Sequence, residues 1–267
     1  IEPGDNATTS MVAAGKADFG VSYQEDVTYA LTSEDPLPIK TIATIIQHNT
    51  SGFVSLKSAN INSVKDFEGK TYAGWGAPSE EAVIKAVMNE AGADFSKLNI
   101  VGSDGSGIAG LSDEVGKNKV NLGWEFYGWA IIKAMQDGYD LNYMPLADLD
   151  SRLDYYTPVI ITNNKMIKKN SDTIQKFMEA TKKGYEYAID HPSKAAEILH
   201  DDALTDTDLK FLKESQKYLS SQYAKDADSW GVMKDSVWDN YTDFMYETGL
   251  IDHKIDAKDQ YTNEFVK

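Results

Sequence analysis

The sequence predicts an α/β protein that folds into two lobes. Short strand-like runs alternate with amphipathic helical stretches through most of the chain, a pattern typical of α/β architecture with largely parallel sheets. At 267 residues the chain also exceeds the usual size of one compact core. Because no low-complexity linker divides it, we expect the chain to cross between the two lobes more than once.

The expected elements follow one another closely up to Asn163. Strands are predicted at Asp18–Ser22, Ile39–Gln47, Phe53–Leu56, Tyr72–Trp75, Asn99–Val101, Asn121–Glu125, Asn142–Pro145 and Val159–Thr162. Helices are predicted over Asn6–Ala14, closed by Gly15, over about Glu25–Leu31, and from the capping residue Ser79 to about Ala91. The chain opens with Ile1–Gly4 in what we interpret as the end of a strand, so we expect further residues upstream.

Beyond Asn163 the chain is expected to be mostly helical. Thr205 and Asp208 resemble a capping box ahead of one of these helices. Two apolar stripes at helical spacing are predicted to face the core: Ile174, Phe177, Met178, Thr181 and Tyr185, and then Val237, Tyr241, Phe244 and Met245.

Composition argues against several classes of function. The formal net charge is −16, and so acidic a chain repels phosphate backbones and anionic lipid. The absence of cysteine excludes disulfides, thiolate zinc sites, iron–sulfur clusters and cysteine nucleophiles. No apolar run approaches the ~18 residues that a membrane span needs. The four histidines lack metal-ligand spacing, and the sequence contains no Walker A loop and no G-x-S-x-G elbow, so we expect no metal, no cofactor and no enzyme.

One motif resembles a cofactor site. Gly105–Gly110 matches the G-x-G-x-x-G dinucleotide fingerprint, follows a predicted strand, and has Glu125 at the end of the next strand. However, Leu111–Asn118 allows at most two helical turns, whereas a dinucleotide-binding crossover needs a longer helix. We interpret the motif as a Gly-rich loop that lines an inter-lobe cleft, and a dinucleotide-dependent enzyme is the alternative.

Aromatic and acidic residues gather where three predicted strands end. These segments are Tyr23–Glu25, Trp75–Glu81 and Trp124–Trp129. In open α/β sheets ligands bind outside the carboxyl ends of the strands, so we predict a binding site there.

The charge of these segments limits the classes of ligand that the site would bind. A helix N-terminus would normally attract an anion, but Glu80 and Glu81 occupy the first turn of the predicted helix themselves. Glu125 adds a carboxylate, and the single arginine of the chain, Arg152, is not near these residues in sequence. The pocket therefore suits a flat, neutral or cationic, nitrogen-rich ring that stacks on Trp or Tyr and donates N–H groups to Glu.

Six segments resemble one protein family. They are Val21–Gln24, Ile45–Asn49, Asp66–Lys70, Gly74–Glu80, Trp124–Trp129 and Leu153–Pro158. They are similar to the thiamine-pyrimidine-precursor binding proteins (hydroxymethylpyrimidine or formylaminopyrimidine), a group of type II solute-binding proteins of ABC importers related to sulfonate and nitrate binders. The D-F-E-G-K element is general to that superfamily, whereas the W-G-x-P and W-x-F-x-G-W elements are more specific.

The resemblance implies a two-lobed type II periplasmic-binding-protein fold with two hinge crossovers, near His48–Gly52 and Arg152–Thr157. Residues 1–50 and 152–267 would form lobe 1, with a helical C-terminal part, and residues 51–151 would form lobe 2. The family's opening strand and its D-W-x-P-N-x-N-H-like element do not occur in the sequence, so we expect part of the site to be missing.

The resemblance also implies a ligand site between the lobes. In it, Trp75 and Tyr23 would stack on the ligand, Glu125, Glu80 and Gln24 would be its polar partners, and the hinge side would carry His48, Asn49 and Tyr155. The expected set is Tyr23, Gln24, His48, Asn49, Trp75, Gly76, Ser79, Glu80, Trp124, Glu125 and Tyr155.

By the same resemblance the chain would be a monomeric, extracytoplasmic binding subunit, periplasmic or lipid-anchored, that delivers a thiamine-related aminopyrimidine to a membrane permease. A riboflavin-like ring is the alternative ligand. A related pyrimidine synthase is an enzyme with a cysteine-rich iron motif, and this cysteine-free chain lacks that motif.

Overall fold

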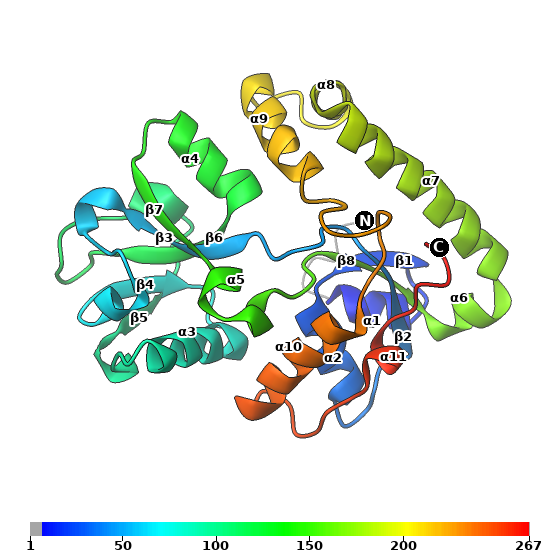
Figure 1. Cartoon of the computed structure of the whole chain (residues 1–267), viewed down its shortest axis with the longest axis horizontal. Coiled ribbons are helices and arrows are strands. Elements are labelled where there is room, and N and C mark those ends of the chain that lie inside the picture. The colour runs from blue at the N-terminus through cyan, green and yellow to red at the C-terminus, as the bar shows by residue number, and fades with distance from the viewer. Residues whose placement is uncertain (1–6, 267) are drawn as a thin grey trace. The chain divides into compact units, whose positions relative to one another are not determined.

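The computed structural model describes residues 7–266, which form two compact units. Unit 1 comprises Ile1–Asn49 and Asp154–Lys267, and unit 2 comprises Thr50–Leu153. The chain thus passes between the units twice. The α/β prediction is confirmed, because both units contain a sheet flanked by helices (Figure 1). The strand end expected at Ile1–Gly4 lies outside the described residues.

Unit 1 is built on a three-stranded sheet in which the last strand lies in the middle. The order is β1-β8-β2, with β1 at Phe19–Ser22, β2 at Ile39–Thr44 and β8 at Val159–Asn163, and β8 runs antiparallel to both neighbours. All five residues of β8 are buried. Its side chains alternate between two cores: Ile160 joins one, whereas Val159 and Ile161 join the other.

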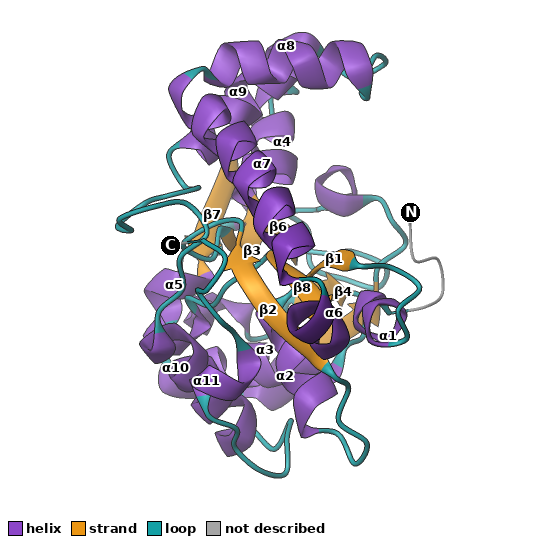
Figure 2. Cartoon of the chain, turned by 90° about the vertical axis from the view of Figure 1, so that its right-hand side faces the viewer, coloured by secondary structure: helices purple, strands orange, loops and turns teal. Residues whose placement is uncertain are grey.

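Loop residues such as Trp230 and Phe265 contribute to the cores of unit 1 together with its helices. The helices are α1 (Thr8–Ala13), α2 (Gln24–Thr32), α6 (Asn164–Lys169), α7 (Ser171–Asp190), α8 (Pro192–Asp202), α9 (Leu209–Ser220), α10 (Asp235–Glu247) and α11 (Ala257–Gln260). Figure 2 shows α7, α8 and α9 together at one end of this unit. Ile174 and Met178 of α7 and Tyr241, Phe244 and Met245 of α10 are buried, as the apolar stripes predict.

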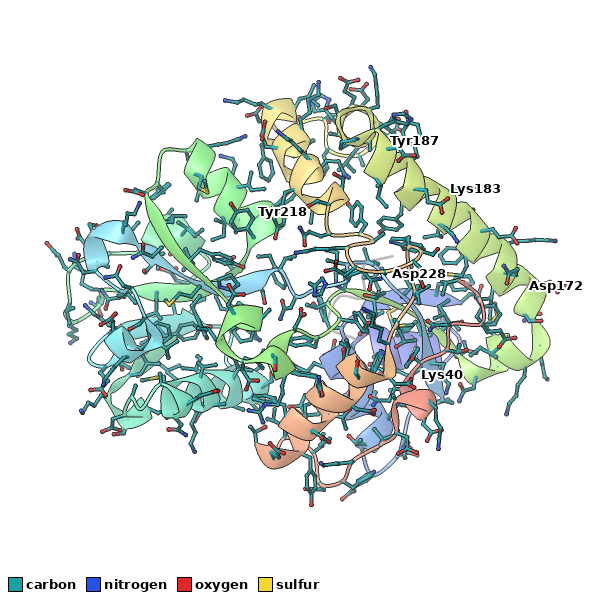
Figure 3. All side chains as sticks on the ribbon, in the orientation of Figure 1. Lys40, Asp172, Lys183, Tyr187, Tyr218 and Asp228 are labelled. Carbon is teal, nitrogen blue, oxygen red and sulfur yellow. The ribbon has the colours of Figure 1, made fainter. Side chains whose placement is uncertain are left out.

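The outer face of α7 is polar, as helical periodicity requires. Asp172, Lys183 and Tyr187 lie on it and are exposed (Figure 3).

Unit 2 carries a five-stranded sheet in the order β5-β4-β6-β3-β7. The strands are β3 (Ser51–Leu56), β4 (Thr71–Gly74), β5 (Asn99–Gly102), β6 (Leu122–Phe126) and β7 (Leu141–Pro145). Only β4 pairs in parallel, with β5 and β6, while β3 is antiparallel to β6 and β7. The expectation of largely parallel sheets is therefore wrong. β3 and β8 are the first strands after each passage between the units, and each runs against both of its neighbours.

One face of this sheet is covered by α3 (Pro78–Glu90), whose buried residues include Val83, Ile84 and Met88. An aromatic cluster packs on the same unit's core, with Phe53 in edge contact with Phe67 at 5.3 Å and with Tyr72 at 6.2 Å between ring centroids. The expectation that Ser79 caps α3 is wrong. The helix begins at Pro78, which needs no hydrogen-bond partner for its nitrogen, and Ser79 lies buried within the first turn.

The remaining elements of unit 2 are α4 (Ile132–Gln136), preceded by a π-helical turn at Tyr127–Ile131, and α5 (Leu146–Leu149). Between β5 and β6 the chain forms no α-helix, only a short 3₁₀ turn at Gly107–Gly110. This loop carries the G-x-G-x-x-G motif, so no helix follows the glycines to receive a dinucleotide pyrophosphate.

Candidate functional site

Unit 2 contains a pocket of about 540 Å³ between its sheet and the loop that joins β5 to β6. The loop stands where a βαβ unit would place a covering helix, which leaves space above the strands. Its lining includes the sheet residues Val54, Thr71, Ala73, Gly74, Val101, Gly123 and Glu125, the two indoles of Trp75 and Trp124, and loop residues from Gly102 to Val120. The Gly-rich loop thus lines a pocket within unit 2, and its place at an inter-lobe cleft stays a prediction.

Two tryptophans stand at the rim of this pocket. Trp75 follows directly after β4 and is 60% exposed, which is unusual for so large an apolar side chain. Its ring meets that of Trp124 edge-on, with 5.1 Å between the centroids and 62° between the planes. Trp124 in turn contacts Phe53 of the neighbouring strand at 5.7 Å. One indole is therefore anchored in the core and the other is open to a planar ligand.

Glu125 lies on the opposite side of β6 from Trp124, because successive strand residues face opposite ways. It lines the pocket, and a Cβ added at Gly107 would stand 3.6 Å from its Oε1. No hydrogen bond or ion pair to its carboxylate occurs among residues 7–266. Burial raises the pKa of Glu125 above its usual value. A half-buried carboxylate without a partner is well suited to receive N–H donors.

Glu80 has a different environment. It is buried in the first turn of α3, and its Oε1 accepts hydrogen bonds from the Tyr72 hydroxyl and from the Trp75 N–H at 3.2 Å. Its Oε2 accepts one from the Gly76 N–H at 2.8 Å. Gly76 itself has φ of +79°, a conformation that favours glycine. Of the expected site residues in unit 2, then, Trp75, Trp124 and Glu125 line the pocket, while Gly76, Ser79 and Glu80 support its rim.

In unit 1, the segment after β1 likewise combines an exposed side chain with a buried one. Tyr23 is 48% exposed, whereas Gln24 is fully buried. The Gln24 amide donates to the Val237 carbonyl at 3.2 Å and accepts from the Tyr156 N–H at 2.9 Å. Both ends of the Gln24 side chain are therefore bonded within unit 1.

Asn49 and Tyr155 lie beside the points where the chain leaves and re-enters unit 1, and both are buried. The Tyr155 ring stacks on that of Tyr241 with 4.0 Å between centroids. The Tyr241 hydroxyl donates to Glu25 Oε2 at 2.9 Å, and burial raises the pKa of both tyrosines. Sequence analysis missed this Glu25–Tyr241 pair, because Tyr241 belonged to a stripe assigned only to the core.

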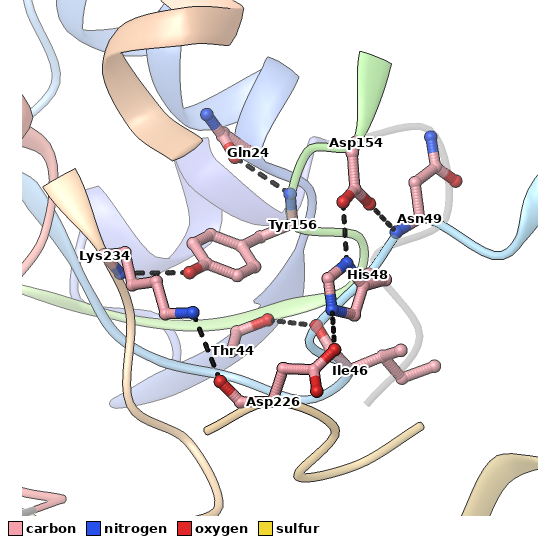
Figure 4. A network of polar contacts seen from close by, with 9 residues as sticks. All are labelled: Gln24, Thr44, Ile46, His48, Asn49, Asp154, Tyr156, Asp226 and Lys234. Carbon is pink, nitrogen blue, oxygen red and sulfur yellow. Dashed lines mark hydrogen bonds and ion pairs between the residues drawn. The ribbon is translucent and has the colours of Figure 1, made fainter. Parts of the chain in front are cut away.

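His48 joins the two segments at this boundary (Figure 4). Its Nδ1 lies 2.6 Å from Asp154 Oδ2, and its Nε2 lies 3.5 Å from Asp226 Oδ2. The second oxygen of Asp154 accepts from the Asn49 N–H at 2.8 Å. The hydrogen bond to Asp154 raises the pKa of His48, against the opposing effect of burial. The cluster ties the outgoing chain at residue 48 to the returning chain at residue 154.

Within residues 7–266 no group of three or more His, Asp or Glu side chains could hold a metal ion. Over the same residues, no helix combines the length and hydrophobicity that crossing a bilayer requires. The Arg152 guanidinium donates two hydrogen bonds to Asp150 Oδ2, from Nε at 3.0 Å and from Nη2 at 2.6 Å.

Comparison with known proteins identifies the family. A family model described as NMT1/THI5 like matches residues 1–195. The chain belongs to the NMT1/THI5-like family. This confirms the resemblance that the six sequence segments indicate.

Three relatives show what other members are named for. The formylaminopyrimidine-binding protein of Halalkalibacterium halodurans is 24% identical over 82% of this chain and 68% of its own length. The riboflavin-binding protein RibY of Chloroflexus aurantiacus is 24% identical, over 88% and 67%. The 4-amino-5-hydroxymethyl-2-methylpyrimidine phosphate synthase of Legionella pneumophila is 22% identical, over 100% and 81%. The relatives therefore include two proteins named as binders and one named as an enzyme.

Among solved structures, the periplasmic aliphatic sulphonate-binding protein SsuA of Escherichia coli has the same fold, with a TM-score of 0.68 over 94% of this chain and 77% of its own. Its sequence is 12% identical. The likeness confirms the predicted type II binding-protein fold and carries no information on the ligand.

Proposed function

We propose that the chain is the substrate-binding subunit of an ABC importer and that it binds a thiamine-related aminopyrimidine in the pocket of unit 2. Family membership, the type II fold and a relative named for formylaminopyrimidine support the proposal. The protein would act outside the cytoplasm as a monomer and would hand its ligand to a membrane permease. Binding would be stoichiometric and without turnover.

A single observation carries the choice of ligand: the carboxylate of Glu125 is half-buried in the lining of a pocket that Trp75 and Trp124 also line, and it has no partner among residues 7–266. An aminopyrimidine offers exocyclic N–H groups to such an oxygen and a planar face to Trp75. A hydrogen bond to a charged group contributes about 1.5–3 kcal/mol, and aromatic stacking adds about 0.5–1.5 kcal/mol beyond the area buried. Together these terms favour a flat, nitrogen-rich ring.

The distribution of charge argues against anionic ligands at this end of the pocket. The positive side chains in its lining, Lys117 and Lys119, lie before β6 begins, whereas Glu125 lies near the end of that strand. Lys119 is also paired with Glu114 at 2.9 Å. A sulfonate at this end of the pocket would therefore meet the carboxylate of Glu125, and the lining offers it no arginine.

Two further points belong to the proposal. Contributions from Tyr23, Gln24, His48, Asn49 and Tyr155 of unit 1 stay a prediction. A riboflavin-like ring is the second candidate, because a relative carries that name and about 540 Å³ accommodates a ligand larger than one pyrimidine.

Calorimetry tests the proposal with four probes: 4-amino-5-hydroxymethyl-2-methylpyrimidine, its formylaminopyrimidine counterpart, riboflavin and taurine. We expect one aminopyrimidine to bind per chain, and Glu125→Gln to weaken it by roughly 1–3 kcal/mol. The matched control is Glu81→Gln, which removes the same charge from an exposed position and should leave affinity unchanged. Tight riboflavin binding would select the second candidate, and tight taurine binding would refute the charge argument.

Tryptophan fluorescence provides a second test of the same site. Trp75→Ala should weaken the aminopyrimidine by about tenfold, which corresponds to about 1.4 kcal/mol. Trp129→Ala removes another exposed indole of unit 2 that does not line the pocket, and should change affinity little. Equal affinity in both variants and the parent would mean that the pocket is not the ligand site. Recovery of a chemically altered pyrimidine would instead favour an enzyme.

A further inference from the structure

The turn between β4 and α3 is organised around one buried carboxylate. Glu80 is 3% exposed, and its two oxygens receive three donors: the Tyr72 hydroxyl, the Trp75 N–H and the Gly76 N–H. A carboxylate offers about four acceptor positions, so most of its capacity is used within the protein. The position in the first turn of α3 adds the favourable field of the helix N-terminus.

The backbone at Gly74 leaves room for this arrangement and for no other. A Cβ added at Gly74 would stand 1.9 Å from Glu80 Oε1 and 2.4 Å from its Cδ, far inside contact distance. The carboxylate thus lies directly against the last residue of β4. With the Glu80 carboxylate in this place, position 74 has no room for a side chain.

The consequence is a fixed direction for the Trp75 side chain. Two successive backbone N–H groups, those of Trp75 and Gly76, point at the same carboxylate, which orients the peptide planes on both sides of the Trp75 Cα. The Trp75 side chain is 60% exposed, whereas Glu80 is 3% exposed, and the Trp75 ring meets the Trp124 ring with 5.1 Å between the centroids.

We infer that Glu80 is a positioning residue: it fixes the Gly74–Gly76 turn and so holds the Trp75 indole against Trp124, and it does not contact the ligand. This differs from the sequence-based expectation that Glu80 is a direct polar partner. The role of Trp75 in binding rests on the proposed function, whereas the geometry of the indole pair can be measured without any ligand.

The ligand-free test uses the exciton coupling of the two indoles in circular dichroism. Trp75→Phe and Trp124→Phe define the part of the spectrum that the pair contributes. We expect Glu80→Ala to lose that part, Glu80→Gln to keep some of it because an amide oxygen can still accept from the backbone, and Glu81→Gln to keep all of it. An unchanged couplet in Glu80→Ala would overturn the inference. If Glu80→Ala fails to fold, Tyr72→Phe and Glu80→Gln carry the test, because each removes only part of the network.

The ligand-bound test is a double-mutant cycle with 4-amino-5-hydroxymethyl-2-methylpyrimidine. If Glu80 acts through Trp75, then Glu80→Ala should weaken binding by no more than the roughly tenfold loss of Trp75→Ala, and the double variant should be no weaker than Trp75→Ala alone. Multiplying losses would show that Glu80 contacts the ligand directly and would overturn the inference. Failure of the parent to bind any aminopyrimidine would refute the proposed function and leave the dichroism result standing.

Discussion

The end of β1 in unit 1 and the end of β4 in unit 2 are assembled from similar residues. Each strand is followed at once by an exposed aromatic residue, Tyr23 or Trp75, and then by a helix with acidic side chains in its first turn. Each segment also contains a fully or almost fully buried polar side chain, Gln24 or Glu80. On sequence alone the two segments are equivalent.

They differ in where the buried side chain finds its partners. Gln24 bonds to Tyr156 and Val237, which are 132 and 213 positions away in the sequence. Glu80 bonds to residues four, five and eight positions away. The long-range bonds tie α2 to other parts of the unit 1 fold, whereas the local bonds shape a turn. The same order of an exposed aromatic residue and a buried polar one therefore serves two purposes. In unit 1 the buried side chain connects distant parts of the fold, and in unit 2 it supports the turn that carries an exposed ring.

The largest effect should come from breaking the long-range tie. Gln24→Leu keeps much of the volume but leaves the Tyr156 N–H and the Val237 carbonyl without partners, so we expect the free energy of unfolding to fall by about 2–3 kcal/mol in urea titrations. Tyr23→Ala, at the exposed neighbour, should change it by less than about 0.5 kcal/mol. A Gln24→Leu variant with parental stability but weakened ligand binding would contradict this and restore Gln24 as a ligand contact.

A single methyl group added at Gly74 should disturb the turn that Glu80 holds in unit 2. Gly74→Ala forces the Glu80 carboxylate or β4 to move, and we expect a loss of about 1–3 kcal/mol together with an altered indole spectrum. Gly102 is the matched control, because it is the register partner of Gly74 on β5 and an added Cβ there meets nothing within 4 Å. Equal stability of Gly74→Ala and Gly102→Ala, measured by thermal unfolding, would show that the turn adapts freely.

These two segments also show what sequence can predict. A short continuous apolar run located β8, and apolar residues at helical spacing located the buried stripe of α7, because buried faces select apolar side chains. Strand direction did not follow from the pattern, since β3 and β8 each reverse after a passage between the units. The hydrogen bond between Tyr72 and Glu80 could be predicted from the sequence, because the two residues are only eight positions apart. The Glu25–Tyr241 bond spans 216 positions, and no local pattern encodes it.

The free carboxylate of unit 2 should behave differently from the bonded one. Burial raises the pKa of Glu125, so the unfolded chain releases this proton at a lower pH than the folded chain does. Folding stability therefore falls as pH rises through that interval, and Glu125→Gln should remove the fall. We expect Glu125→Gln to be more stable than the parent near neutral pH, by less than about 1 kcal/mol because water partly screens the group, and to match it in acid. Melting temperatures of the ligand-free proteins across this range measure it, and a destabilised Glu125→Gln would imply a partner for the carboxylate.

The smallest effect should come from the boundary of unit 1, where His48 is held by groups distant in sequence. Asp154 and Asp226 face the imidazole and Lys225 opposes them, and the hydrogen bond to Asp154 raises the pKa of His48 in the folded state. Because the unfolded value is about 6.5, the stabilisation is fully present below that pH and is lost as pH rises through the folded value.

We expect the parent to lose stability relative to His48→Gln between about pH 6 and the folded pKa, by less than about 1 kcal/mol because the imidazole is one-third exposed. Urea midpoints at several pH values measure the difference. Asp154→Asn keeps the acceptor for the Asn49 N–H at 2.8 Å but removes the charge. Its stability should therefore change less with pH over the same interval. If His48→Gln retains the parental profile while Asp154→Asn loses it, the titrating group is not His48, and the tie between the two boundary segments does not depend on its proton.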